Sequence, residues 1–235
     1  GDIIKAMNTP FLYAFWAINA GPESTETLRQ LRLMRRLDFN GVVYHPRFYP
    51  GNPTYLSDDY FKSLETTVAQ AKGEGLDFWL YDEDGWPSGT VSGTLLKRFS
   101  EHRNQWLALS RTSEAPAGEV LFRFTAPDGH SYVLVRKWGE TLDYLKAGAT
   151  DRFLEMCHQR YREHLSDEAW SCISAMFTDE PQLGDHDPVQ THVWIPWTEN
   201  LAEIYADRCG RNFAEDAVGL VFDVEGSGGC RVAFR

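Results

Sequence analysis

The sequence has few cysteines, and none of them belongs to a recognisable metal or redox motif. Its four cysteines lie far apart, and no two have the CxxC spacing that is typical of zinc sites and thiol–disulfide enzymes. Scattered cysteines indicate free thiols, which favours a reducing compartment. Long apolar runs are also missing, because no stretch approaches the ~20 residues of a membrane-spanning helix. The first residues lack both Met and the layout of a signal peptide, so the localisation is unknown at this point: a cytoplasmic protein and a secreted, processed one both fit.

Positive charge is scarce as well. The chain has 23 Lys and Arg residues against 34 Asp and Glu residues, which gives a net charge of −11 at pH 7. Such an acidic chain argues against a nucleic acid or an anionic membrane as the main partner. The glycine patterns of dinucleotide and P-loop sites are absent, so we expect no nucleotide site.

What the sequence does contain is an alternation of short apolar runs and amphipathic segments. Apolar runs at 11–18, 42–44 and 76–81 have the character of buried strands. Between them, apolar residues recur with helical spacing at 28–37 and 60–71. Such strand–helix repeats of about 30–35 residues are typical of parallel strands joined by right-handed crossovers.

The rhythm changes after the third run. Pro127-Asp128-Gly129 is a turn signal between apolar runs at 120–125 and 132–137, so a β-hairpin is expected there. The other expected elements are a helix at 95–109, a linker at 114–118, a helix at 150–165, a fourth strand at 172–177 and a helix capped by Thr198 that ends at Gly210. The tail after residue 218 shows no clear fifth unit.

Four strands are half of what a closed (β/α)8 barrel needs, which is on the order of eight strands in 250 residues. The predicted fold class is therefore α/β of the TIM-barrel type, partial, with about four βα units and a β-hairpin insertion. We expect a single domain over 1–235, with the inserted segment at about 112–140. Two alternatives stay open, namely pairing of two copies and an open sheet.

A set of motifs then occurs in a fixed order over about residues 10 to 225. They are FWAIN (15–19), GVVYHPR (41–47), YLSDDYF (55–61), WLYDEDGWPSG (79–89), DYLKAGATDRF (143–153), FTDEP (177–181) and IPW (195–197). This order resembles the glycosidase-like barrels related to glycoside hydrolase family 106, the α-L-rhamnosidases. The resemblance implies a TIM-type barrel with a sugar-cleaving, inverting site at the carboxyl ends of its strands, and calcium as an associated ion. It also implies that a missing barrel half, or a second copy, completes the fold.

Glycoside hydrolysis uses two carboxyl groups, one to protonate the leaving oxygen and one to act as a nucleophile or as a base through water. Asp179 and Glu180 directly follow the fourth predicted strand and precede Pro181. By analogy with the family, Glu180 is the predicted general acid, and Asp179 beside it is the other predicted catalytic residue. The carboxylate that pairs with Glu180 is expected in a missing segment or in a second chain, in which case this chain alone is inactive. The alternative is an acidic turn at the start of a helix.

The third predicted strand ends in an acidic turn, Asp82-Glu83-Asp84, followed by GWPSG (85–89). Three clustered carboxylates repel each other, so at least one needs a raised pKa or a positive partner. The predicted substrate-binding residues are Asn19, His45, Arg47, Asp82, Glu83, Asp84, Trp86 and Trp197. Flat aromatic rings in such loops stack on the C–H faces of sugars, although a Trp can equally plug a barrel mouth. A solvated acidic turn and a structural His45 are the corresponding alternatives.

No firm metal site is predicted. The acidic turn and Asp185-His186-Asp187 are candidates for calcium or a transition metal, but neither has EF-hand spacing. His158 and His164 are interpreted as surface residues of a helix.

The predicted function is a glycoside hydrolase that acts on rhamnose-like or other polysaccharide sugars through acid/base carboxylates. One alternative is a non-catalytic carbohydrate-binding or structural half-barrel. The other is a metal-dependent hydrolase that uses His45, Asp82 and Asp84, or the loop at 185–187.

Overall fold

The computed structural model describes residues 11–19, 24–47, 51–115, 117–184 and 193–234. Its residues group into two compact units, which are described separately. The first unit comprises residues 1–98 and 151–181, and the second comprises residues 99–150 and 182–235. The expectation of a single partial-barrel domain therefore stays a prediction.

The first unit contains a parallel four-stranded sheet in the order β1-β2-β3-β7. The strands are β1 (Tyr13–Ile18), β2 (Gly41–Pro46), β3 (Asp77–Tyr81) and β7 (Ile173–Phe177). Four parallel strands in this order are what the repeat pattern predicts. Among the described residues β1 and β7 are the edges of an open sheet, so the mixed α/β class is confirmed and a closed barrel stays a prediction.

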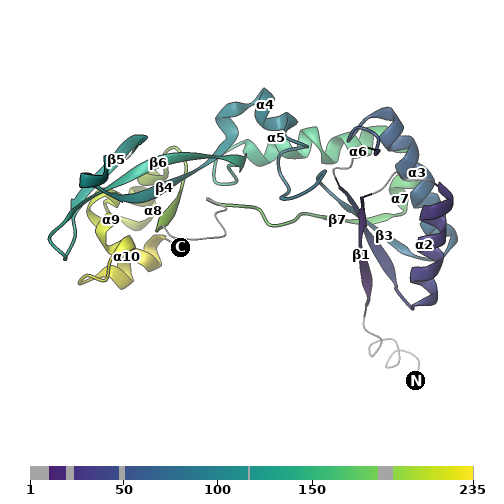
Figure 1. The fold of residues 1–235 in the computed structure, drawn as a ribbon, viewed down its shortest axis with the longest axis horizontal. Coiled ribbons are helices and arrows are strands. Elements are labelled where there is room, and N and C mark those ends of the chain that lie inside the picture. Colours follow the sequence, from purple (N-terminus) through teal and green to yellow (C-terminus); the bar gives the residue numbers. More distant parts are fainter. Residues whose placement is uncertain (1–10, 20–23, 48–50, 116, 185–192, 235) are drawn as a thin grey trace, which may run out of the picture. The chain divides into compact units, whose positions relative to one another are not determined.

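Two helices connect the first three strands, and both cover the same face of the sheet (Figure 1). They are α2 (Ser24–Arg36) and α3 (Asp58–Gly73). Ser57 caps α3 by accepting a hydrogen bond from the backbone N–H of Tyr60, as its position before two acidic residues predicts. The rings of Trp16, Tyr44 and Phe78 contact each other in turn, and these residues are buried.

The other face of the sheet carries a second row of rings, because side chains alternate along a strand. Phe15 contacts His45, Tyr81 and Phe177, and His45 stacks on Tyr81. The exposed fraction falls from 51% at Phe15 to 1% at His45 and 0% at Tyr81. This aromatic face ends at the carboxyl edge of the sheet, where the candidate site lies.

Short helices complete the first unit, and two predictions made for this part of the chain need correction. The helices are α4 (Thr94–Arg98), α5 (Ala149–Met156), α6 (His158–His164) and α7 (Asp167–Ser171). The single helix predicted at 150–165 is interrupted at Cys157, whose thiol donates to the backbone carbonyl of Asp82. The helix predicted at 95–109 is wrong beyond Arg98, because the chain continues through a short 3-10 turn (Ser100–His102) into a strand.

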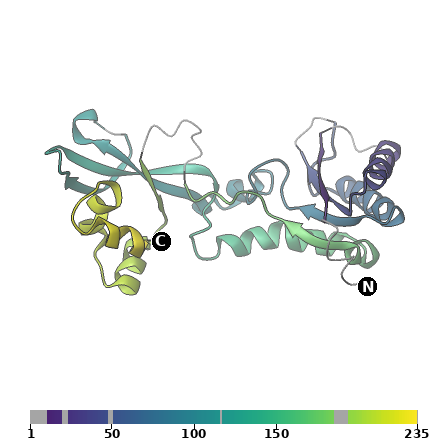
Figure 2. The same ribbon diagram turned by 90° about the horizontal axis from the view of Figure 1, so that it is seen from below.

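The second unit is an antiparallel sheet with helices packed on one of its faces (Figure 2). Its strands, in the order β5-β6-β4-β8, are β5 (Glu119–Thr125), β6 (Ser131–Leu142), β4 (Arg103–Arg111) and β8 (Trp194–Trp197). A 3-10 turn (Thr112–Glu114) follows β4, and three helices close the unit: α8 (Leu201–Cys209), α9 (Phe213–Val221) and α10 (Ser227–Phe234). The β5–β6 pair is the predicted hairpin.

The end of the chain was predicted less well. The strand β8 and the helices α9 and α10 were not anticipated. Thr198 does not cap α8, which begins at Leu201 after Asn200; its hydroxyl donates instead to the buried Asp143, at 2.8 Å. No helix in the described part of the chain is long and apolar enough to cross a membrane.

Candidate active site

The polar residues predicted from the sequence gather at one edge of the parallel sheet, because parallel strands present their carboxyl ends together. Asn19, His45 and Arg47 follow or end β1 and β2. The acidic turn follows β3, and Asp179 and Glu180 follow β7. All of these belong to the first unit. Trp197 belongs to the second unit, where it is 6% exposed and packs against Phe122 and Phe213.

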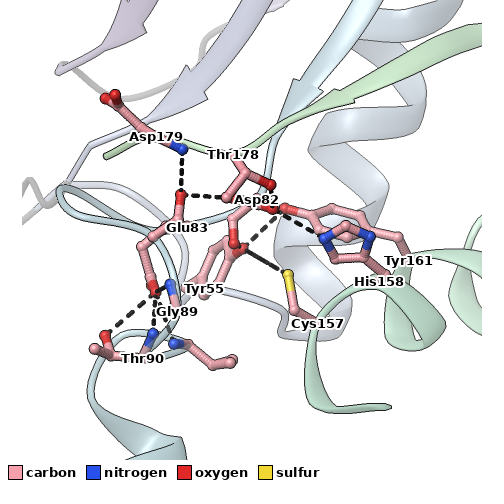
Figure 3. Close-up of polar contacts among 12 residues, drawn as sticks. Tyr55, Asp82, Glu83, Gly89, Thr90, Cys157, His158, Tyr161, Thr178 and Asp179 are labelled. Carbon is pink, nitrogen blue, oxygen red and sulfur yellow. Dashed lines mark hydrogen bonds and ion pairs between the residues drawn. The ribbon is translucent and has the colours of Figure 1, made fainter. Parts of the chain in front are cut away.

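Asp82 is fully buried at the centre of this edge (Figure 3). Its Oδ1 accepts a hydrogen bond from the Ser88 hydroxyl at 2.6 Å. Its Oδ2 accepts from the Thr178 hydroxyl at 2.6 Å and from Nε2 of His158 at 2.9 Å. This carboxylate therefore ties together β3, the end of β7 and α6. His158 was interpreted as a surface residue, but its side chain is only 26% exposed.

Glu83, at 1% exposure, anchors the loop that follows the strand (Figure 3). Its two carboxylate oxygens accept from five backbone N–H groups, those of Asp84, Gly89, Thr90, Val91 and Ser92. The Thr90 hydroxyl donates to it as well. Burial raises the pKa of Glu83, and the backbone donors oppose that rise by stabilising the ionised form.

The acidic turn thus meets the requirement that the sequence set for three adjacent carboxylates. Burial raises the pKa of both Glu83 and Asp84, and three hydrogen bonds hold the Asp82 carboxylate. The oxygens of Asp82 and Glu83 are occupied by protein donors, so the substrate role predicted for these two residues stays a prediction. Asp84 is half-buried, and the Ser92 hydroxyl donates to its carboxylate at 3.3 Å.

Ser88 links the loop to the end of β7. Its hydroxyl accepts from the backbone N–H of Asp179 at 3.0 Å, and its own N–H donates to the Asp179 carbonyl at 3.1 Å. The carboxylate of Asp179 points away from Asp82 (Figure 3) and accepts a hydrogen bond from the Tyr81 hydroxyl at 3.0 Å. Burial, together with this bond, raises the pKa of Tyr81, so the phenol remains a donor to Asp179.

His45 is buried against Tyr81, with their ring centroids 3.5 Å apart. Its Nε2 lies 2.8 Å from the carbonyl oxygen of Gly85. A carbonyl can only accept, so Nε2 carries the hydrogen and Nδ1 is a bare acceptor, with no partner among the described residues. Burial lowers the pKa of His45, the Gly85 carbonyl opposes that shift, and the charge of Arg47 lowers the pKa further.

The remaining predicted residues are more open. Asn19, Arg47 and Glu180 are exposed, Asp179 is half-buried, and Trp86 is 40% exposed. Glu180 has a φ of 41°, in the left-handed region. A non-glycine residue in that region turns the chain sharply where β7 ends. Asp179 and Glu180 are therefore the accessible carboxylates that follow β7.

A buried chain of hydroxyl and thiol groups lies beside Asp82 and was not anticipated from the sequence. The Tyr60 and Tyr161 hydroxyls are 2.8 Å apart, and Tyr161 donates to Tyr55 at 3.2 Å. The Tyr55 hydroxyl is 3.5 Å from the Cys157 thiol, which donates to the Asp82 carbonyl at 3.1 Å. Burial raises the pKa of every member of this chain. The groups thus stay protonated and neutral, which suits a structural role.

The acidic turn does not fit a calcium ion. Calcium needs several free oxygen ligands, whereas the oxygens of Asp82 and Glu83 already accept hydrogen bonds. Within the described ranges no group of three or more His, Cys, Asp and Glu side chains is placed to hold a metal. The Asp185-His186-Asp187 loop lies outside the described residues.

Comparison with known proteins adds little to this geometry. No protein-family model and no curated protein matches the sequence. Among solved structures, the rhamnosidase from Novosphingobium sp. PP1Y is similar to part of the chain, with a TM-score of 0.29 and 14% identity. The match covers 50% of this chain and 11% of that one. A similarity this weak carries no conclusion about the fold or the activity of this chain.

Proposed function

We propose that this chain is a glycoside hydrolase whose reacting carboxylates, Asp179 and Glu180, follow β7. The proposal is carried by the position of the Asp179 carboxylate. It is half-exposed and accepts a hydrogen bond from the Tyr81 hydroxyl, and the exposed Glu180 is the next residue. Acid/base cleavage of a glycosidic bond uses two carboxyl groups that flank the bond, and groups at the carboxyl edge of a parallel sheet are placed to contact a bound substrate.

In this proposal Glu180 protonates the leaving oxygen, and Asp179 is the second carboxylate, oriented by Tyr81. Arg47 and Trp86 are exposed at the same edge. They contribute hydrogen bonds to sugar hydroxyls and a stacking surface. Asp82 and Glu83 are buried and hold the edge together rather than contacting the sugar. Rhamnose-like sugars are the first substrates to test.

The test uses pairs of substrates that differ only in the leaving group. The 2,4-dinitrophenolate group of a dinitrophenyl glycoside leaves without being protonated. The sugar that leaves from a disaccharide needs a proton donor. Glu180→Gln should therefore reduce kcat on a disaccharide by about 100-fold or more, because general acid catalysis contributes ~10²–10⁴-fold. On the dinitrophenyl glycoside the loss should be much smaller. Glu225→Gln, an exposed position of the second unit, is the matched control and should behave like the wild type.

Equal losses of activity on both substrates would contradict the role of Glu180 as the acid. An absence of turnover on every glycoside tested would contradict the proposed function. Asp179→Asn should lower activity on both substrates alike, because the second carboxylate acts whatever the leaving group.

A second candidate is a non-catalytic carbohydrate-binding protein. It is favoured by one specific observation, namely that two of the three carboxylates of the acidic turn are buried and already hydrogen-bonded. Calorimetric titration with the same disaccharides separates the two functions. Heat of binding without release of reducing sugar over many hours would favour this candidate.

A further inference from the structure

The first unit contains a cavity of about 780 Å³ that Asp179 and Glu180 do not line. Its walls are residues 52–56 before α3, part of the loop after β3, and residues of α4, α5 and α6. The volume lies in the range of sites for small organic ligands, roughly 300–1,000 Å³. The cavity is therefore large enough for a ligand and distinct from the proposed reacting groups.

The charged groups of the lining are mixed in sign. Asp84, Glu155 and Glu163 bring carboxylates, while Arg98 and Arg160 bring guanidinium groups. Recognition of a phosphate or of a polycation needs one sign to dominate. A lining that holds both donors and acceptors instead suits an uncharged ligand with many hydroxyl groups, because each hydroxyl both donates and accepts.

Asn52 adds an independent observation. It lines the cavity, and its side-chain amide donates to the carbonyl of Ile18 at 3.1 Å and to that of Arg47 at 2.9 Å. Its Oδ1 is buried and has no hydrogen-bond partner among the described residues. An unpaired buried acceptor costs free energy, so this end of the wall holds a polar side chain whose hydrogen bonds are incomplete.

The lining also offers apolar surface. Pro53, Leu56 and Met156 lie on the wall, together with the half-buried Tyr55. A sugar ring presents C–H groups on its faces and hydroxyls on its edges, so it matches a wall that combines both kinds of surface.

We propose that this cavity binds a neutral mono- or disaccharide unit at a site separate from the reacting carboxylates. The ligand class follows from the lining alone. A role in positioning the non-reacting part of a substrate rests on the proposed function. Asn52 would carry that coupling, because its amide is bonded to the ends of β1 and β2.

The test is calorimetric titration of the full chain with methyl α-L-rhamnopyranoside, maltose and cellobiose, alongside glucose 6-phosphate and glucosamine. At least one neutral sugar should bind, and the two charged sugars should bind at least ten-fold more weakly. Gln159→Trp and Met156→Trp place a large ring at the cavity wall and should weaken that binding at least ten-fold. Leu154→Trp adds the same ring at an exposed position of α5 outside the lining and should leave it unchanged.

The inference is overturned if none of the neutral sugars binds at millimolar concentration, or if the charged sugars bind as tightly as the neutral ones. It is also overturned if both Trp variants bind the sugar like the wild type. Its failure is distinguishable from that of the proposed function. If both Trp variants keep wild-type turnover and wild-type sugar binding, the cavity site is contradicted and the hydrolase proposal stands. If Gln159→Trp abolishes sugar binding and the wild type shows no turnover, the hydrolase proposal is contradicted and the cavity site stands.

Discussion

The strongest structural prediction concerns Glu83, whose carboxylate organises residues 84–92. In Glu83→Gln an amide NH2 replaces one carboxylate oxygen. The smaller loss results if the NH2 takes the position of Oε1, which accepts from the N–H groups of Asp84 and Ser92. Two backbone donors then face another donor. The Oε2 position would be worse, because three backbone N–H groups and the Thr90 hydroxyl point at it.

The magnitude follows from these contacts. Each unsatisfied buried donor costs about 1–3 kcal/mol. Both of these bonds are part-buried, so water relieves some of that cost. Removing a charge that burial disfavours, as the raised pKa of Glu83 shows, offsets a further part. We expect the free energy of unfolding to fall by about 2–3 kcal/mol, at the lower end of the sum for two such donors.

Amide hydrogen exchange measured by mass spectrometry locates this loss. If the loop opens locally, the exchange rate of residues 84–92 should rise by about 30-fold for a loss of ~2 kcal/mol, while β2 changes less. Urea unfolding gives the global value. Asp84→Asn is the matched control, because the Ser92 hydroxyl at 3.3 Å is a weak contact, and it should change stability by no more than about 0.5 kcal/mol. Unchanged exchange in the loop of Glu83→Gln would refute the reasoning.

Three further predictions follow from single contacts. Gly41→Ala should lower the free energy of unfolding by about 1–3 kcal/mol, because a Cβ there would lie 2.5 Å from Tyr13 Cε1 and 2.7 Å from the Asp77 carbonyl oxygen. Gly73→Ala is the control and should not lower the melting temperature, because the space around Gly73 is open. Equal losses of stability in the two variants would contradict the steric argument. Burial lowers the pKa of His45, so His45 takes up a proton less readily in the folded than in the unfolded protein. The free energy of unfolding should therefore fall as the pH drops below about 6.5. In urea titrations between about pH 7 and 5, His45→Gln should make this dependence on pH weaker, and an unchanged dependence would refute the role of His45. Hydrogen bonds from Arg211 lower the pKa of Asp216 to about 2. Asp216 therefore stabilises the second unit above its unfolded pKa near 3.9, and this contribution is lost as the pH falls toward about 2. Asp216→Asn should lower the free energy of unfolding by about 1–2 kcal/mol at pH 7 and make stability depend less on pH in the acid range, whereas wild-type behaviour would contradict the role of the ion pair.

The parallel sheet could be predicted because its determinants are local in the sequence. Each strand is a short apolar run, and each connecting helix shows its own periodicity, as in α3 with its Ser57 cap. The strand β4 was missed for the opposite reason. Its buried positions include the polar residues Asn104 and Gln105, so no apolar alternation marks it. Asn104 is satisfied by the carbonyl of Gly184, 80 residues away, and a partner so distant leaves no local signal.

The sequence could place the candidate residues at strand ends, but it could not predict the hydrogen bonds among them. The acidic turn, His45 and the Asp179–Glu180 pair were all identified from their places at strand ends. The sequence shows three equivalent carboxylates at 82–84, whereas the structure gives each a different environment. The difference arises from donors that a sequence does not display, namely the backbone N–H groups around Glu83 and the His158 ring, which lies 76 residues from Asp82.

Some carboxylates at the carboxyl edge of the parallel sheet are buried and others are accessible, and this difference limits which of them can exchange a proton with a ligand. A group that exchanges a proton with a substrate must reach that substrate, and must lose or gain its charge without collapsing the structure around it. The carboxylate oxygens of Asp82 and Glu83 accept hydrogen bonds that hold the end of β7 and the loop, so these two groups are part of the framework of the edge. The Asp179 carboxylate accepts a hydrogen bond from the Tyr81 phenol, and the Asp179 backbone N–H donates to the Ser88 hydroxyl, which keeps the backbone in place. The buried acids therefore hold the edge together, and Asp179 and Glu180 are the accessible carboxylates after β7 to which the proposed function assigns the chemistry.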